Sequence, residues 1–198
     1  MKKYLFIIVF LIPFYVLNAQ TDSETTNSNP IFIGIGYERF IANLTPVNMF
    51  ALDVELFVSN ELSLNYNFSL GILNSKVYIH SYAGLPAALY LMLSNIGNEN
   101  TANSSSDILN YISFLLIFVP EGISYHFPMD NKMSLVPYIN PLGYEFLGDV
   151  NSFSSSIGMK MKINPISDLF IVPYVGIKYL YNLKMPAYNI GATAGLKF

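Results

Sequence analysis

Apolar and polar residues alternate along most of this chain, and no other feature constrains its fold as strongly. Between 61 and 72 every even position is apolar and every odd position is polar, charged or glycine. Residues 50–58 and 188–198 follow the same rule with few exceptions, and 152–163 alternate with the apolar residues at odd positions. Only a β-strand gathers alternate side chains on one face. The sequence therefore predicts an all-β, antiparallel, up-and-down arrangement.

Weaker alternation marks further strands and gives nine segments in total. A barrel with both chain ends on one side of a membrane needs an even number, so we expect about eight strands, within a range of 8–10. Proline cannot donate to a strand ladder, so Pro137, Pro141 and Pro173 predict bulges or register shifts. The weaker segments are 31–41, 76–83, 122–127, 133–146 and 169–180.

Composition indicates which row of each strand faces outward. A soluble sandwich or lipocalin-like barrel also alternates, with its apolar row inward and a charged outer face. Here only 12% of residues are charged, against about 25% in an average soluble domain. An outer-membrane barrel turns its apolar row toward lipid and its polar row into the interior, here called the lumen. Residues 31–198 are thus predicted to form a transmembrane β-barrel, with a soluble periplasmic ligand-binding barrel as an alternative.

Placing the polar rows inward also places the charges. Acids fall on the early strands and bases on the late ones, and barrel closure sets the first strand beside the last. A charge network could therefore form across that seam and offset the cost of burying each charge alone, which predicts a polar, closed lumen. A site in water at a strand end remains open for Asp53 and Lys197. The predicted network is Glu38, Asp53, Glu55, Lys160, Lys162, Lys178 and Lys197.

The first 30 residues carry targeting information. Met1-Lys2-Lys3, an apolar run over 4–17 and a small residue at Ala19 are typical of a secretory signal peptide, 1–19, cleaved near Ala19. Residues 20–30 are polar without an apolar period and predict a flexible lead-in. The sequence thus predicts export to the outer membrane of a Gram-negative cell.

The sequence lacks several features on which particular partners, metals and cofactors depend. The chain has no cysteine, which excludes disulfides, thiolate metal sites and a cysteine-linked lipid anchor. Its formal net charge is −3 and it lacks a basic patch, so nucleic acid is not an expected partner. No clustered His, Asp or Glu spacing indicates a metal, and the glycines follow strand alternation rather than a phosphate loop. We therefore predict no cofactor and no metal.

The middle of the chain departs from alternation. Residues 85–96 and 107–120 are rich in helix-forming apolar residues and flank a polar stretch, which predicts an apolar helical hairpin inserted at about 85–120. Each helix is too short to span a bilayer. We expect contact with lipid or with another membrane protein; packing on the barrel wall, or two further strands, is the alternative. The predicted contact residues are Leu89, Leu93, Ile112, Leu115 and Leu116.

These features together resemble a known family. The signal peptide, the alternation, the glycine-rich start at 34–37 and the end at 191–198 resemble small bacterial outer-membrane β-barrels such as outer membrane protein X and the membrane domain of outer membrane protein A. The low-charge composition looks like the Bacteroidota versions. The resemblance implies that Phe198 is part of the signal read by the barrel-assembly machinery, and that outer-membrane lipid surrounds the barrel.

Two functions are compatible with such a barrel. The first is a non-catalytic scaffold or complex subunit. The second is a lipid-modifying enzyme acting on the acyl chains of lipid A, because some small barrels have that activity. The best triad-like set for it is His126 with Ser124, two residues apart on one strand face, and Glu121 nearby. A polar lumenal row near a turn is the simpler interpretation of these residues.

Overall fold

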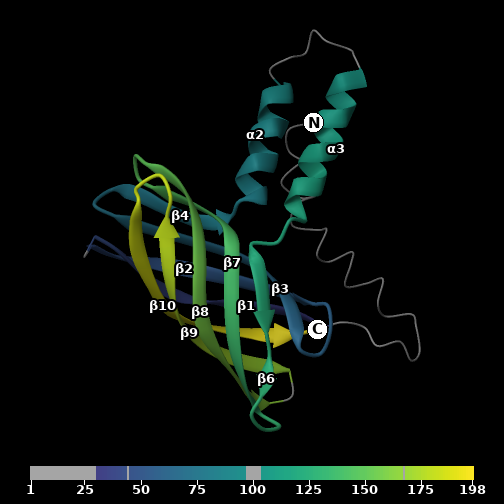
Figure 1. Cartoon of the computed structure of the whole chain (residues 1–198), viewed down its shortest axis with the longest axis vertical. Coiled ribbons are helices and arrows are strands. Elements are labelled where there is room, and N and C mark those ends of the chain that lie inside the picture. The colour runs from purple at the N-terminus through teal and green to yellow at the C-terminus, as the bar shows by residue number, and fades with distance from the viewer. Residues whose placement is uncertain (1–29, 44, 97–103, 167) are drawn as a thin grey trace.

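The computed structural model describes residues 30–43, 45–96, 104–166 and 168–198. The predicted signal peptide and lead-in lie outside these residues, except for Pro30. Figure 1 shows a barrel of long tilted strands with two helices attached to its side. The strands are β1 (Ile31–Ala42), β2 (Thr45–Phe57), β3 (Leu62–Leu73), β4 (Lys76–Tyr82), β5 (Gly122–Tyr125), β6 (Phe127–Pro128), β7 (Met133–Leu147), β8 (Asn151–Ile166), β9 (Leu169–Leu180) and β10 (Met185–Lys197).

All strand pairings are antiparallel, and the sheet closes on itself. The neighbours run β2-β1-β10-β9-β8-β7-β4-β3, and pairing of β2 with β3 completes the circle. The first and last strands are adjacent, with Gly36 opposite Thr193. The prediction of a closed, antiparallel barrel is confirmed.

Ten strands form eight wall positions because three short strands share one of them. β4 pairs with the far half of β3, where Ser81 lies opposite Phe68. β5 pairs with the near half, where Gly122 lies opposite Asn65. β6 continues along β7 beyond β5. The nine segments in the sequence are thereby reconciled with an even-numbered wall, since 76–83 and 122–127 each supply part of one wall position.

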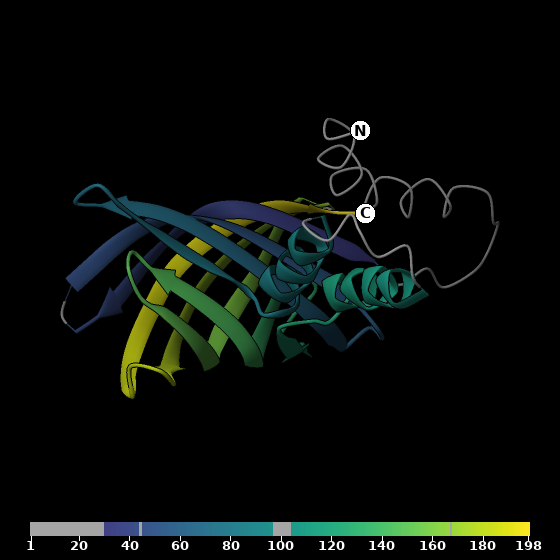
Figure 2. The same cartoon turned by 90° about the horizontal axis from the view of Figure 1, so that it is seen from above.

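The interruption of this wall position holds the helices α2 (Gly84–Ile96) and α3 (Ser104–Ile117). Figures 1 and 2 show them as a hairpin that stands away from the wall. The helices pack against each other, and α2 touches the barrel chiefly at the adjoining β4. The predicted helical insert is thus present, and the alternative of two further strands is wrong. No helix among the described residues is long and apolar enough to cross a membrane.

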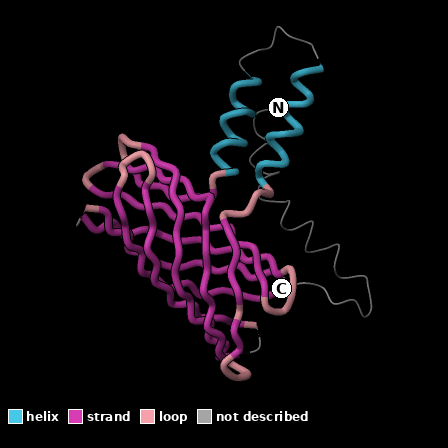
Figure 3. Tube along the Cα trace, in the orientation of Figure 1, coloured by secondary structure: helices cyan, strands magenta, loops and turns pink. Residues whose placement is uncertain are grey.

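A bulge in β7 faces the interrupted wall position, where Figure 3 shows the two helices joined to the strands through loops. The β7–β8 register shifts between Asn140 and Gly143, around Pro141. The shift frees Leu142 to bind both edges of the interruption: its carbonyl accepts from Ala83 N at 2.7 Å and its N–H donates to Glu121 O at 3.0 Å. The predicted bulge is therefore confirmed at Pro141.

Among the described strands, the other two prolines do not form the predicted bulges. Pro137 pairs in register with Met159, and Pro173 pairs in register with Ala192. Proline removes only one donor, and a strand tolerates that loss when the neighbouring pairs are kept.

Candidate functional site

The two faces of the wall differ as an outer-membrane barrel requires. The lumenal row of β3 includes Ser63 and Asn65, both fully buried. Outward-facing Phe50, Ile157 and Ile190 are each more than half exposed. A soluble barrel has the opposite arrangement, with its apolar row inside. The lumen, rather than the outer surface, therefore collects the polar side chains of the strands.

One group of charges bridges the full width of the lumen. Asp53 and Glu55 on β2 meet Lys160 and Lys162 on β8, which lies four wall positions away and thus on the opposite side. Lys160 Nζ lies 3.1 Å from Asp53 Oδ2 and 2.9 Å from Glu55 Oε1, and Lys162 Nζ lies 2.9 Å from Glu55 Oε2. All four side chains are buried. Two acids facing two bases give a locally neutral group, here called the cross-lumen quartet.

A second buried group centres on Glu145 of β7. Its Oε1 lies 2.6 Å from Lys178 Nζ and 2.8 Å from His80 Nδ1. The other ring nitrogen, His80 Nε2, lies 3.3 Å from Glu121 Oε1, and Asn67 Nδ2 donates to Glu121 Oε2 at 2.5 Å. Lys178 Nζ also lies 3.1 Å from His80 Nδ1. This group links the interrupted wall position to β7 and β9.

Glu38 borders a small cavity between these two groups. It accepts a hydrogen bond from Tyr174 Oη at 2.9 Å. The cavity has a volume of about 30 Å³, which is space for one or two water molecules. Glu38 Oε1, Asn189 Oδ1 and Thr193 Oγ1 are buried without a hydrogen-bond partner among the described residues, and all three residues line this cavity. This cavity among the described residues is therefore polar and large enough for water, but too small for a larger solute.

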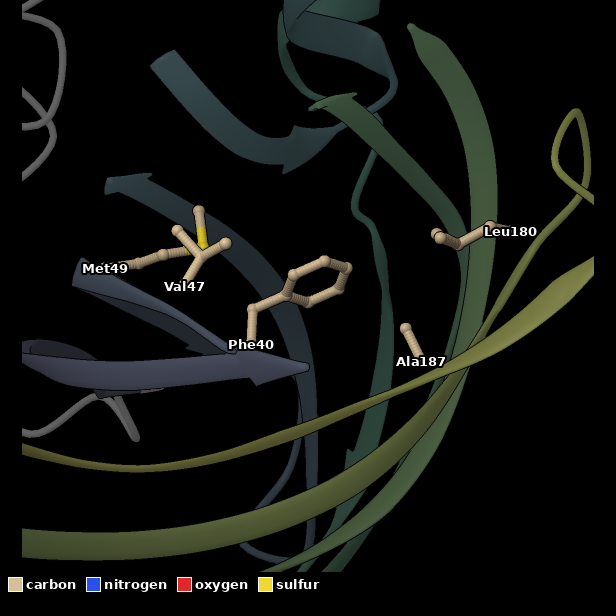
Figure 4. Close-up of a cluster of buried hydrophobic side chains, with 5 residues drawn as sticks. All are labelled: Phe40, Val47, Met49, Leu180 and Ala187. Carbon is tan, nitrogen blue, oxygen red and sulfur yellow. The ribbon is translucent and has the colours of Figure 1, made fainter. Parts of the chain in front are cut away.

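Apolar side chains close the lumen at both ends. Near the β1–β2 and β9–β10 turns lies a buried cluster, drawn in Figure 4, of Phe40, Val47, Met49, Leu180 and Ala187. Toward the chain termini, Phe32, Phe170 and Val172 are buried together. Lys162 Nζ lies 4.3 Å from the centre of the Phe32 ring, a cation–π distance that joins this cluster to the quartet. The predicted polar lumen therefore has apolar ends.

Six of the seven charges predicted for the lumen are buried there, and Lys197 is not. Lys197 pairs with inward-facing Phe32 but is exposed, because it stands at the end of β10 where the wall opens to solvent. The pairing also differs from the predicted one: the ion pairs cross the lumen instead of following the β1–β10 seam. An eight-stranded barrel is narrow enough for side chains of opposite walls to meet.

The residues of the catalytic alternative are not brought together. Ser124 Oγ donates to Asn65 Oδ1, and His126 Nε2 lies 2.9 Å from Ser63 Oγ and 3.6 Å from Glu55 Oε2. Glu121 instead contacts His80. The described residues contain no group of three or more His, Cys, Asp or Glu that could hold a metal ion.

Of the second group, sequence reasoning placed Lys178 in the lumen and Glu121 only in the catalytic alternative, and it assigned no role to His80 or Glu145. Both lie in weakly alternating segments, where the lumenal row is hard to assign from sequence. In β7 the lumenal row runs through Asn140, then skips two residues at the bulge and continues through Gly143 and Glu145. The predicted bulge at Pro141 was the signal that the row changes parity there.

The predicted contact residues of the hairpin are largely accessible. Leu89, Leu93, Ile112 and Leu115 are exposed, and Leu116 is half-buried. At the other predicted feature, the C-terminus, Phe198 exchanges backbone hydrogen bonds with Ile31.

Comparisons with known proteins bear on the fold. The N-terminal β-barrel domain of OprF from Pseudomonas aeruginosa is 11% identical, with a TM-score of 0.53 over 86% of this chain and 98% of that one. Ail, the attachment invasion locus protein of Yersinia pestis, is 11% identical, with a TM-score of 0.48 over 86% and 99%. No family model and no curated protein matches the chain.

The barrel domain of OprF and this chain share a closed antiparallel wall at very low identity, so the likeness concerns architecture. It agrees with the closure, the eight wall positions and the inverted faces described above. The chain therefore has the fold of the small eight-stranded outer-membrane β-barrels, the family that its sequence resembles.

Proposed function

We propose that this protein is a non-catalytic outer-membrane β-barrel with a closed lumen, serving as a scaffold or as a subunit of a membrane complex. The observation that carries the proposal is the filling of the lumen. The cross-lumen quartet spans its width and apolar clusters lie at both ends, which supports a lumen closed to solutes.

Export and assembly belong to the same proposal. The signal peptide at 1–19 would direct the chain across the inner membrane, with cleavage near Ala19. Phe198, at the end of the last strand, would serve the barrel-assembly machinery as a recognition residue. The exposed aliphatic and aromatic side chains of the wall, such as Ile157 and Ile190, would face outer-membrane lipid.

Cell fractionation and a gel assay test this proposal. We expect the protein in the outer-membrane fraction after a carbonate wash, with a faster gel migration before boiling than after it. Release by carbonate would contradict a transmembrane barrel and would favour the soluble alternative.

Mass spectrometry of lipid A from a deletion strain addresses the catalytic alternative. We expect an unchanged acylation pattern. A changed pattern that His126→Gln reproduces would overturn the non-catalytic proposal.

Affinity purification in mild detergent tests for a complex. A matched control removes residues 83–120. On β3, Asn67 and Tyr66 face the gap between Ser81 and Gly122. The deletion joins Tyr82 directly to Glu121, and these two residues would fill that gap. We expect a stoichiometric membrane partner with the full chain and its loss with the shortened one. Equal recovery with both chains would argue against a partner contact through the hairpin.

A further inference from the structure

We infer that the helical hairpin of α2 and α3 lies within the bilayer, entering the lipid from the side of the barrel at about half its height, with acyl chains as its contact partner. This inference rests on the proposed transmembrane barrel. It assigns the hairpin to a depth and an environment, where the sequence alone left lipid, a protein partner and the barrel wall open.

The depth follows from the register of the interrupted wall position. The hairpin leaves and re-enters the wall opposite Tyr66 and Asn67, in the middle of β3. On the other side it faces the bulge after Asn140, in the middle of β7. Loops of transmembrane barrels normally join strand ends at the membrane surfaces. An insertion in the middle of two flanking strands instead starts inside the hydrocarbon layer.

The backbone at this root is satisfied internally, as an environment without water demands. Leu142 binds Ala83 N and Glu121 O across the interruption, and Glu121 N donates to Asn65 O at 2.8 Å. Tyr66 Oη donates to the carbonyl of Phe118, the residue after α3 and its turn, at 2.8 Å. The break in the wall therefore leaves these groups paired without solvent.

The side chains of the hairpin suit lipid on all sides. Asp107, near the start of α3, is the one charged residue in the sequence of the two helices, and no charged residue occurs in 84–96 or 108–120. Exposed apolar or aromatic residues follow one another around α3, and the exposed set continues onto α2; a helix that is apolar all round belongs in a membrane or a protein core. The exposed residues are Leu89, Tyr90, Leu93, Ile108, Leu109, Tyr111, Ile112, Phe114 and Leu115.

Two serine hydroxyls on the helices are bonded within their own helix. Ser94 Oγ donates to Leu91 O at 2.8 Å and Ser113 Oγ donates to Leu109 O at 2.7 Å. The helices also approach closely at the root: a Cβ on Gly84 would lie 2.1 Å from Leu116 O. A docking site for a second protein would need one apolar face and one polar face exposed to solvent. The described side chains of the helices are not divided in that way.

The length of the helices fits one leaflet. α2 has 13 residues and α3 has 14, which corresponds to about 20 Å at the α-helical rise. Half of the hydrocarbon layer is about 15 Å. Because the hairpin touches the barrel chiefly at its root, packing does not hold it at a fixed tilt. It can therefore incline until the far ends of α2 and α3, at Ile96 and Ser104, reach the depth of the headgroups.

Single tryptophans can measure this depth without background, because the chain contains none. The probes are Tyr90→Trp and Leu115→Trp on the hairpin. The lipid control is Ile177→Trp on the outer face of β9, and the water control is Val150→Trp in the β7–β8 turn; both residues are exposed. Each variant is refolded into phosphatidylcholine vesicles, and heat-dependent gel migration confirms that the barrel has formed.

Two quenchers then give the result. We expect lipids brominated along the acyl chain to quench both hairpin probes as strongly as Ile177→Trp, and aqueous iodide to quench them several-fold less than Val150→Trp. Iodide quenching equal to that of Val150→Trp would overturn the inference, as would shielding from both quenchers, which a second copy would cause. If the brominated lipids do not quench the fluorescence of Ile177→Trp either, the proposed transmembrane barrel is contradicted, and not only the depth of the hairpin.

Discussion

The barrel and the helical hairpin differ in where their polar and apolar side chains lie. In the barrel, most buried charges form ion pairs inside a closed wall, and the outer face is formed by one apolar row of each strand. In the hairpin, charges are absent from 84–96 and 108–120, and apolar side chains are exposed around the helices. The barrel thus carries its own stabilising contacts, whereas the hairpin depends on what surrounds it. Substitutions in the two regions should therefore differ sharply in cost.

The largest effect is expected inside the quartet. Glu55→Ala would leave Lys162 buried without its carboxylate partner and would remove one of two partners of Lys160. Breaking a buried ion pair from one side costs about 3–5 kcal/mol. Urea unfolding of the refolded barrel in detergent micelles measures the loss. A change below about 1 kcal/mol, the typical value of an exposed pair, would contradict a desolvated quartet.

The apolar end of the lumen should follow closely. Phe40 is 1% exposed at the centre of the cluster near the turns. Phe40→Ala should reduce the free energy of unfolding by about 3 kcal/mol, through lost burial and the cavity left behind. The same urea titration measures it, with Phe50→Ala, on the exposed outer row, as the matched control. Equal losses in detergent for both variants would argue that Phe40 is not packed in an interior.

Removal of the hairpin should change the barrel much less. Deletion of 83–120 keeps the register of the interrupted wall position and removes few contacts with the strands. We expect the shortened chain to refold and to retain its heat-dependent migration, with a smaller stability loss than Glu55→Ala causes. Failure to refold in detergent would mean that the hairpin is part of the barrel's own core, and the contrast between the regions would collapse.

The smallest effect is expected at an ion pair outside the lumen. Lys76, the first residue of β4, forms a salt bridge with Asp149 in the β7–β8 turn, and both side chains are exposed. Asp149→Ala should cost about 0–1 kcal/mol, since water screens such a pair. Repeating the urea titration at high salt should abolish this difference while leaving the Glu55→Ala effect largely in place.

The alternation of residues was sufficient to predict the wall, its inverted faces and most of its lumenal charges. It worked because strand period is a local property. The partners of each charge were not predictable in this way: Glu55 and Lys162 are joined by a contact across the barrel, which depends on wall order and lumen width rather than on sequence distance.

Other features of the structure were not predicted from the sequence, for different physical reasons. The apolar ends were missed because the rows of Phe40 and Val47 also carry Glu38 and Asp53, and alternation assigns a row without showing where along it apolar residues gather. Lys197 was misplaced because alternation indicates a row but not how far along the strand the lumen remains closed. The shared wall position of β4 and β5 needs pairing of segments about forty residues apart, which no periodicity records.

Electrical conductance across a planar lipid bilayer tests the central claim of a filled, ion-paired lumen most directly. Purified full-length protein, refolded and checked by heat-dependent migration, is added to the bilayer, with a general porin as positive control. The account predicts a current equal to that of protein-free lipid over the applied voltage range. Reproducible stepwise openings that Glu55→Ala alters would contradict it, because they would require an aqueous path through the quartet.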